Sequence, residues 1–228
     1  MSNAARNSYD QIAERWHANH RSPDYVSRTL AYVDKVLEGV PRGSRVLDLG
    51  CGTGEPVASY LVRRGFRVVG VDQSEKMLEI ARRVVPEAEL IRADMVDVEL
   101  NGKFFAAVAW DSVFHVGRRH HAAVYRKLAD ALEDGARLLL SVGGSDAREG
   151  DEDSGGDFDA EGFTSEMFGH TFFYSAYAPK VARALLEAAG FEIELWETDD
   201  PSSRGHITVI ARRVAMREQL KLSEARRP

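Results

Sequence analysis

The residues most suited to chemistry begin with three glycines, Gly50, Gly52 and Gly54, which directly follow the mostly apolar segment 46–49. Because glycine has no Cβ, such a turn can adopt positive φ angles and let a bound molecule approach the backbone. In a doubly wound α/β sheet, a turn of this kind lies at the carboxyl end of the first strand, beside the crevice where ligands bind. The spacing therefore predicts a ligand site.

Two carboxylates follow at the ends of later apolar segments. Asp72 ends the segment 66–72 and lies about 20 residues beyond the turn, where an acid that accepts both hydroxyls of a ribose is expected. Asp94 ends the next segment, where an oxygen can receive an adenine amino group and Met95 can pack on the ring. A dinucleotide fingerprint would need a glycine where Glu55 stands, and this carboxylate would repel a pyrophosphate. The pattern therefore disfavours NAD and FAD.

A second polar group follows the fourth apolar segment, 104–110. His115 is a candidate general base because the ordinary pKa of histidine is near 6.5; a core or capping role is the alternative. Asp111 could hold a substrate amine or a catalytic water. Tyr174 could line an acceptor pocket, and His206 enters the last predicted strand; each has a structural role as its alternative.

Apolar segments that alternate with segments of helical period must position these groups. The strands are expected at 45–49, 66–72, 89–95, 104–110 and 137–142, with a further helix stopped by Gly135 and one begun by Pro179. The last segments, 191–198 and 206–212, leave no room for a helix between them, so an antiparallel pair is expected. The pattern predicts an α/β doubly wound sheet.

The chain is expected to divide into three parts. Two amphipathic helices within residues 1–42 form a helical cover, residues 43–214 form the ligand-binding domain, and residues 215–228 form a charged tail. Residues 143–162 are rich in glycine, serine and acidic side chains and predict a mobile acidic loop. This loop would attract a cationic acceptor if it is more than a solvated surface, and could close over it.

Composition narrows the classes of partner. The formal net charge of -6 disfavours nucleic acid, and a single cysteine, Cys51, is typical of a reducing compartment. No apolar stretch approaches the roughly 20 residues that span a bilayer. A cytoplasmic protein without a membrane partner is expected. We expect no metal, because no His-x-x-x-His spacing occurs, and we expect His120 and His121 to be exposed at the start of a helix.

Specific stretches resemble the class I S-adenosylmethionine (SAM)-dependent methyltransferases. They are Val46-Leu47-Asp48-Leu49-Gly50-Cys51-Gly52-Thr53-Gly54, Val68-Val69-Gly70-Val71-Asp72 and Arg92-Ala93-Asp94-Met95. The opening Tyr9-Asp10-Gln11-Ile12-Ala13-Glu14-Arg15-Trp16 resembles small-molecule methyltransferases related to the ubiquinone-biosynthesis type. The resemblance implies a seven-stranded Rossmann-like methyltransferase sheet of order 3-2-1-4-5-7-6 with the last strand antiparallel. It also implies SAM as cofactor and S-adenosylhomocysteine as product.

The resemblance further implies which residues serve the reaction. The expected cofactor-binding residues are Tyr9, Trp16, Asp48, Gly50, Cys51, Gly52, Gly54, Asp72, Gln73, Met77, Asp94, Met95 and Trp110. The expected catalytic residues are His115, Asp111, Tyr174 and His206. The hypothesis is methyl transfer to N or O of a small molecule by in-line displacement, with His115 as a possible base. C-methylation stays open, and a non-catalytic SAM sensor on the same fold is the alternative.

Overall fold

In the computed structural model, the described residues are 8–19, 22–142, 163–200 and 206–215. The predicted mobile acidic loop, 143–162, lies outside these ranges. Almost all of the predicted charged tail, 215–228, lies outside them as well.

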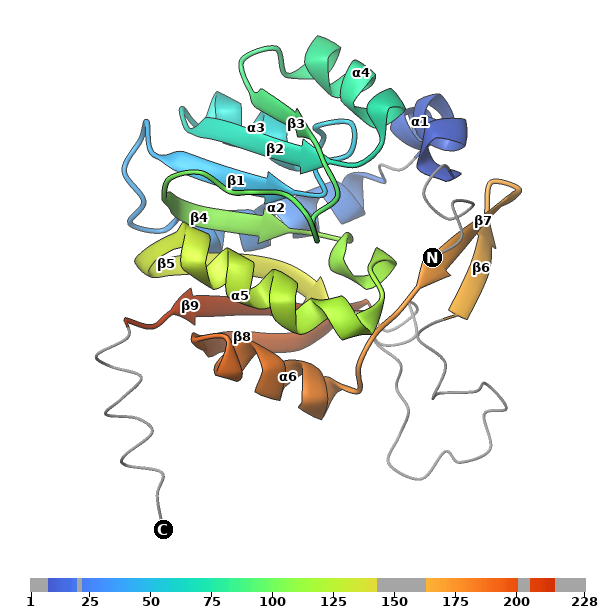
Figure 1. The fold of residues 1–228 in the computed structure, drawn as a ribbon. Helices are drawn as coiled ribbons and strands as arrows, with labels where there is room; N and C mark the ends of the chain where they lie inside the picture. The colour runs from blue at the N-terminus through green and yellow to red at the C-terminus, as the bar shows by residue number, and fades with distance from the viewer. Residues whose placement is uncertain (1–7, 20–21, 143–162, 201–205, 216–228) are drawn as a thin grey trace.

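The centre of the molecule is a seven-stranded sheet of order β3-β2-β1-β4-β5-β9-β8 (Figure 1). Its strands along the chain are β1 (Arg45–Leu49), β2 (Arg67–Asp72), β3 (Glu89–Arg92), β4 (Phe104–Ala109), β5 (Leu132–Val142), β8 (Phe191–Asp200) and β9 (His206–Arg213). The neighbouring strands β3, β2, β1, β4 and β5 all pair in parallel, whereas β9 is antiparallel to β5 and β8. The predicted Rossmann-like sheet is confirmed, and its strand labels differ only because two unpredicted strands intervene.

Helices cover both faces of the sheet, as a doubly wound fold requires. They are α1 (Ser8–Asn19), α2 (Pro23–Leu37), α3 (Val57–Arg63), α4 (Glu75–Val84), α5 (His121–Ala131) and α6 (Pro179–Ala188). Alternate residues of a strand point to opposite faces, so Leu47 packs in the cluster under α5 and α6 while Val46 packs in the cluster under α2 and α3. The sheet is therefore buried on both sides, and its strand ends are held rigidly.

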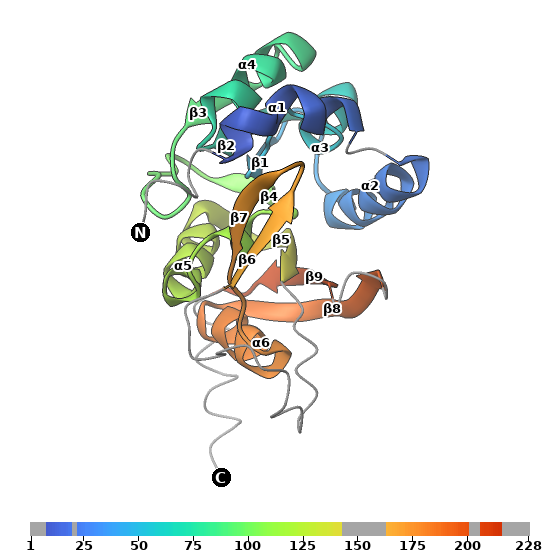
Figure 2. The same ribbon diagram turned by 90° about the vertical axis from the view of Figure 1, so that its right-hand side faces the viewer.

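The two unpredicted strands, β6 (Phe163–Met167) and β7 (His170–Tyr174), form a separate hairpin. Phe168 and Gly169 between them both have positive φ angles, of 53° and 80°, which suits the tight turn of a hairpin. Figure 2 shows the hairpin beside α1, and the Ser8 hydroxyl donates to the Thr171 carbonyl at 2.7 Å. The hairpin therefore meets the N-terminal cover across the carboxyl edge of the sheet.

Several predicted element ends were wrong. Helix α5 ends at Ala131 rather than near Gly135, because Leu132 already pairs with Phe104 at the start of β5. Strand β3 ends at Arg92 and β4 at Ala109, so the polar residues that follow lie in loops. His121 was expected to be exposed but is buried, because its Nε2 atom lies 2.9 Å from the Val116 carbonyl in the turn before α5.

Candidate active site

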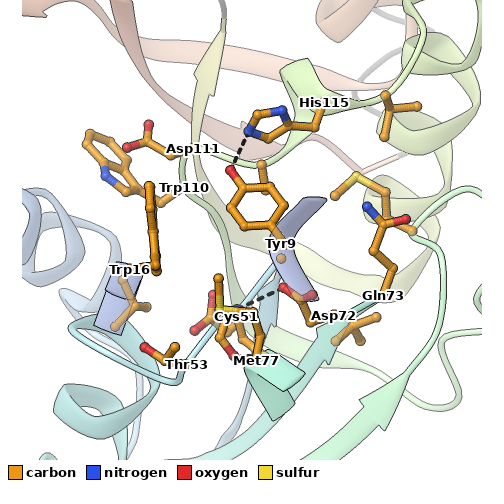
Figure 3. Close-up of a pocket in the computed structure, with 18 of the residues that line it drawn as sticks. Tyr9, Trp16, Cys51, Thr53, Asp72, Gln73, Met77, Trp110, Asp111 and His115 are labelled. Carbon is orange, nitrogen blue, oxygen red and sulfur yellow. Dashed lines mark hydrogen bonds between the residues drawn. The ribbon is translucent and has the colours of Figure 1, made fainter. Parts of the chain in front are cut away.

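A cavity of about 340 Å³ opens at the carboxyl ends of β1, β2 and β4, with α1 across it (Figure 3). The cofactor candidates that line it are Tyr9, Trp16, Asp48, Gly50, Cys51, Gly52, Asp72, Gln73, Met77, Asp94, Met95 and Trp110, together with the catalytic candidates Asp111 and His115. Segments far apart in the sequence thus meet in one cavity, which is the arrangement expected of a binding site in an open α/β sheet.

Three predicted site residues do not line the cavity. Gly54 faces helix α4 instead, since an added Cβ would lie 2.8 Å from a methyl group of Val85. Tyr174 lies behind the wall and stacks on Phe114, with ring centroids 5.9 Å apart. His206 contacts two residues of the wall: its Nε2 lies 2.6 Å from Asp111 Oδ1, and its ring centroid lies 5.5 Å from that of Trp110. They lie outside the cavity lining, and their roles toward the ligand stay predictions.

The glycine turn brings backbone to the cavity at close quarters. Gly50, Gly52 and Gly54 have φ angles of 85°, 53° and 80°, in the region that favours glycine. The N–H groups of Gly50 and Cys51 both donate to the Val71 carbonyl, at 2.7 and 3.0 Å. A Cβ at Gly50 would lie 2.3 Å from the Cβ of Ser112, so this turn is packed directly against the loop after β4.

Asp72 links the turn to the second strand. Its Oδ2 accepts the Gly52 N–H at 2.9 Å, and its Oδ1 accepts the Ser74 N–H at 2.8 Å. Desolvation raises the pKa of this carboxyl, while these two backbone donors act against the rise. A carboxylate has about four lone-pair sites, so the backbone donors leave room for a ligand hydroxyl.

Asp48, within β1, is buried near Asp72. Burial, and secondly the charge of Asp72, raises the pKa of the Asp48 carboxyl to about 7. Its charge therefore changes near neutral pH and responds to a nearby cation.

Asp94 and Met95 lie in the loop that follows β3. The Asp94 Oδ1 accepts the N–H of Val96 at 2.9 Å, which turns the chain under the cavity. The Lys127 ammonium donates to the carbonyls of Met95 and Val96, at 3.0 and 2.6 Å. Helix α5 thereby holds the floor of the cavity in place.

His115 contacts two groups from distant parts of the chain. Its Nδ1 lies 2.9 Å from the Phe173 carbonyl of β7, and its Nε2 lies 2.7 Å from the Tyr9 hydroxyl of α1. Burial lowers the pKa of the imidazole, which favours the neutral ring. Since a carbonyl only accepts, Nδ1 carries the proton and Nε2 accepts from Tyr9.

Asp111 has a positive φ of 48°, which is uncommon outside glycine and often occurs at functional sites. Its N–H donates to the Ser141 hydroxyl at 2.6 Å, its Oδ2 accepts the Tyr25 hydroxyl at 2.9 Å, and its Oδ1 lies 2.6 Å from His206 Nε2. Burial alone would raise the pKa of this carboxyl, but His206, with Tyr25 and Ser141, lowers it below the ordinary value. Asp111 is therefore held as an anion.

Sequence reasoning missed Tyr25, Ser141 and Phe173, although each bonds a predicted catalytic residue. Tyr25 also accepts the Trp110 indole N–H at 2.9 Å. These residues carry no local motif, because Tyr25 sits in an ordinary amphipathic helix and Phe173 acts through its backbone. Only the spatial arrangement identifies them.

Within the described ranges, no three His, Cys, Asp or Glu side chains come together as metal ligands. No helix within the same ranges is both long and apolar enough to cross a bilayer.

Known proteins resemble this chain in sequence. Residues 46–135 match the family model of a methyltransferase domain. A dTDP-3-amino-3,4,6-trideoxy-alpha-D-glucopyranose N,N-dimethyltransferase from Streptomyces venezuelae is 33% identical over 122 residues, which cover 53% of this chain and 51% of that protein. An O-methyltransferase from Pyrenophora dematioidea is 29% identical over 106 residues, 43% of this chain and 39% of that protein. The chain thus matches about half or less of the length of these curated relatives.

Solved structures share the fold. The crystal structure of Streptomyces venezuelae DesVI has a TM-score of 0.64 and 21% identity, covering 90% of this chain and 98% of that chain. A Burkholderia thailandensis 1,6-didemethyltoxoflavin-N1-methyltransferase, solved with S-adenosylhomocysteine bound, has a TM-score of 0.65 and 18% identity, covering 93% and 89%. Residues 46–135 thus resemble a methyltransferase domain, and the described residues share the fold of these solved structures.

Proposed function

We propose that this chain transfers a methyl group from SAM to a nitrogen or oxygen of a small molecule. The observation that carries the proposal is a single cavity in which the glycine turn and Asp72 face the polar residues Asp111 and His115. A cofactor half and an acceptor half are both needed for transfer, because the enzyme's main task is to align donor and nucleophile.

The cofactor half fits SAM in its chemistry. The Asp72 carboxylate offers acceptors for ribose hydroxyls, and the backbone at Gly52 borders open space, since an added Cβ would meet nothing within 4 Å. Asp94 and Met95 stand where an adenine is expected, and Asp48 can pair with the amino group of the methionine part. When bound, SAM would supply an electrophilic methyl group on a sulfonium, and an acceptor that attacks this carbon in line would displace the thioether.

The charge of the cavity favours an acceptor such as an amine, which can bind as a neutral molecule or as a cation and attacks in its neutral form. The described residues that line the cavity include no lysine or arginine but five carboxyl side chains, namely Asp48, Glu55, Asp72, Asp94 and Asp111. Carboxylates attract an ammonium and disfavour a carboxylate or phosphate acceptor. Two relatives, from Streptomyces venezuelae and Streptomyces fradiae, are N,N-dimethyltransferases of dTDP-linked amino sugars, which is consistent with a nitrogen acceptor. A small molecule is therefore proposed rather than nucleic acid.

A nitrogen or oxygen acceptor also needs a group that removes its proton. His115 suits this task because its imidazole is held neutral in the cavity wall. General base catalysis of this kind contributes roughly 100-fold or more to a rate. Asp111, held as an anion, is placed to orient the acceptor.

A SAM-binding sensor is the second candidate, because the same fold can bind the cofactor without turnover. The buried, fully partnered Asp111 and His115 favour an enzyme, since a sensor has no need of a polar acceptor side. Turnover separates the two functions.

The test begins with calorimetric titration of SAM and S-adenosylhomocysteine. Mass spectrometry then follows turnover against a panel of amines, phenols and carboxylic acids. We expect micromolar binding and a product heavier by one methylene from an amine or phenol. Binding with no product from any acceptor would favour the sensor, and no binding of either ligand would contradict the proposed function.

A further inference from the structure

We propose that the hydroxyl of Tyr9, rather than the imidazole of His115, meets the acceptor and relays its proton to His115. This inference rests on the proposed function. It assigns Tyr9, which was expected to bind the cofactor, to proton transfer, and it makes His115 the base that acts through Tyr9.

The hydrogen bonds of His115 fix which of its two ring nitrogens is basic. The Phe173 carbonyl, 2.9 Å from Nδ1, fixes the proton on that nitrogen. In the neutral ring the basic atom is therefore Nε2, and Tyr9 already occupies it at 2.7 Å. An acceptor cannot reach this lone pair without displacing Tyr9. A proton from the acceptor therefore reaches His115 Nε2 through the Tyr9 hydroxyl.

The Tyr9 ring is held in place without its hydroxyl. Its ring meets Trp16, His115 and Phe172 edge to face, with centroid separations of 5.7, 5.3 and 4.8 Å. Helix α1 is fixed separately, since Asp10 Oδ1 accepts the Ser74 hydroxyl at 2.5 Å. Docking of the helix therefore does not require the bond to His115.

Figure 3 places Tyr9 across the cavity, between His115 on one side and the glycine turn with Asp72 on the other. The hydroxyl thus lies where the cofactor half meets the acceptor half. This is the position that a proton acceptor for an incoming nucleophile must occupy.

Burial, followed by the nearby groups Tyr174, Asp72 and Asp111, raises the pKa of Tyr9 well above its ordinary value. A free phenolate is therefore disfavoured. Tyr9 can take a proton only while it gives its own away, and His115 Nε2 is the atom in contact to receive it.

The reaction then balances as follows. The acceptor's lone pair forms the new bond to the methyl carbon, and the carbon–sulfur bond breaks with its electron pair going to sulfur. The acceptor's proton passes to the Tyr9 oxygen as the phenolic proton passes to His115 Nε2. The products are the methylated acceptor, the neutral thioether and an imidazolium whose Nδ1–H still bonds the Phe173 carbonyl.

Tyr9→Phe tests the relay because it removes one oxygen and keeps the ring. Tyr60→Phe is the matched control, since the Tyr60 hydroxyl bonds Asp34 and Arg64 on α2 and α3, away from the cavity. With the amine or phenol that the wild type methylates, we expect kcat to fall about 100-fold in Tyr9→Phe. Its calorimetric affinity for S-adenosylhomocysteine should stay within about twofold, and Tyr60→Phe should match the wild type in both.

The double variant Tyr9→Phe/His115→Ala sharpens the test. Because the two residues act as one unit, the kcat of the double variant should be no lower than that of the slower single variant. Multiplying losses would overturn the relay, as would wild-type kcat in Tyr9→Phe. A parallel loss of S-adenosylhomocysteine affinity in Tyr9→Phe would also overturn it and return Tyr9 to the cofactor cover.

Nitrogen-15 NMR of labelled histidine gives a readout that needs no acceptor. At neutral pH the His115 signals, identified by their loss in His115→Ala, should show the proton on Nδ1. A proton on Nε2 would overturn the relay. Absence of product from the wild type would contradict the proposed function itself, whereas undiminished product from Tyr9→Phe contradicts the relay alone.

Discussion

The two halves of the cavity are built in different ways. The cofactor half depends on backbone groups close together in the chain: Asp72 binds the N–H groups of Gly52 and Ser74 at the ends of adjacent strands. The acceptor half depends on side chains from three separate segments, since Tyr9 meets His115 across 106 positions and His206 meets Asp111 across 95. Local geometry fixes the first half, and only long-range packing assembles the second.

The carboxylates of the two halves also differ in their hydrogen-bond partners and in the direction of their pKa shifts. Asp72 is partnered by neutral backbone donors, and desolvation raises its pKa. Asp111 is partnered by His206 and Tyr25 side chains, and its pKa is lowered despite burial. One cavity therefore contains a carboxyl whose pKa is raised and one whose pKa is lowered.

The largest effect, on the free energy of unfolding, is expected at Gly50, where the two halves of the cavity are in contact. In Gly50→Ala the new Cβ would lie 2.3 Å from Ser112 Cβ, on backbone with a φ of +85°. We expect a loss of about 3 kcal/mol in the free energy of unfolding, from strain and overpacking together. Urea denaturation measures it. Gly135→Ala is the control, since its φ of +81° is similar but nothing lies within 4 Å. Equal losses in the two variants would contradict the close packing of the halves.

Asp72→Ala should damage the cofactor half alone. We expect SAM affinity to fall at least tenfold, on the order of 1.4 kcal/mol, because the ribose hydroxyls lose their acceptor and the Gly52 N–H loses its partner. Calorimetry measures the affinity, and the circular dichroism melt checks the fold. Unchanged affinity in a folded variant would remove Asp72 from the cofactor site.

His206→Ala should damage the acceptor half alone. Removing the donor at 2.6 Å should raise the pKa of Asp111 and lower kcat/KM roughly tenfold, while S-adenosylhomocysteine affinity stays unchanged. Tyr25→Phe removes the other side-chain donor and should act in the same direction. A loss of cofactor affinity in His206→Ala would show that the halves are coupled through Asp111.

The smallest expected effect is a pH dependence in the cofactor half. Asp48 has a pKa of about 7, so it is mostly neutral at pH 6 and mostly ionised at pH 8. Cationic SAM prefers the ionised form, so its affinity should fall about fivefold from pH 8 to pH 6. Titrations at both pH values measure this, and Asp48→Asn should remove the dependence. A pH dependence that persists in that variant would assign it to another group.

Much of the cavity lining could be predicted from the sequence. Most predicted cofactor residues line the cavity, but Gly54 faces α4 and Tyr174 and His206 stand behind the wall. The β6–β7 hairpin was missed because its alternation is weak and its turn consists of Phe168 and Gly169 rather than a typical turn pair. Whether the lining residues bind SAM as assigned stays a prediction that the variants test.

The sequence by itself determined the parallel sheet, the glycine turn and the positions of Asp72 and Asp94 near its edge. These follow from periodicity and from the φ angles that glycine permits, which are properties of neighbouring residues. Only the tertiary structure decided that Tyr9 occupies the basic nitrogen of His115 and that His206 and Tyr25 hold Asp111 as an anion. The physical reason is that hydrogen-bond direction and desolvation depend on groups brought together by folding, whose separation along the chain carries no local signal.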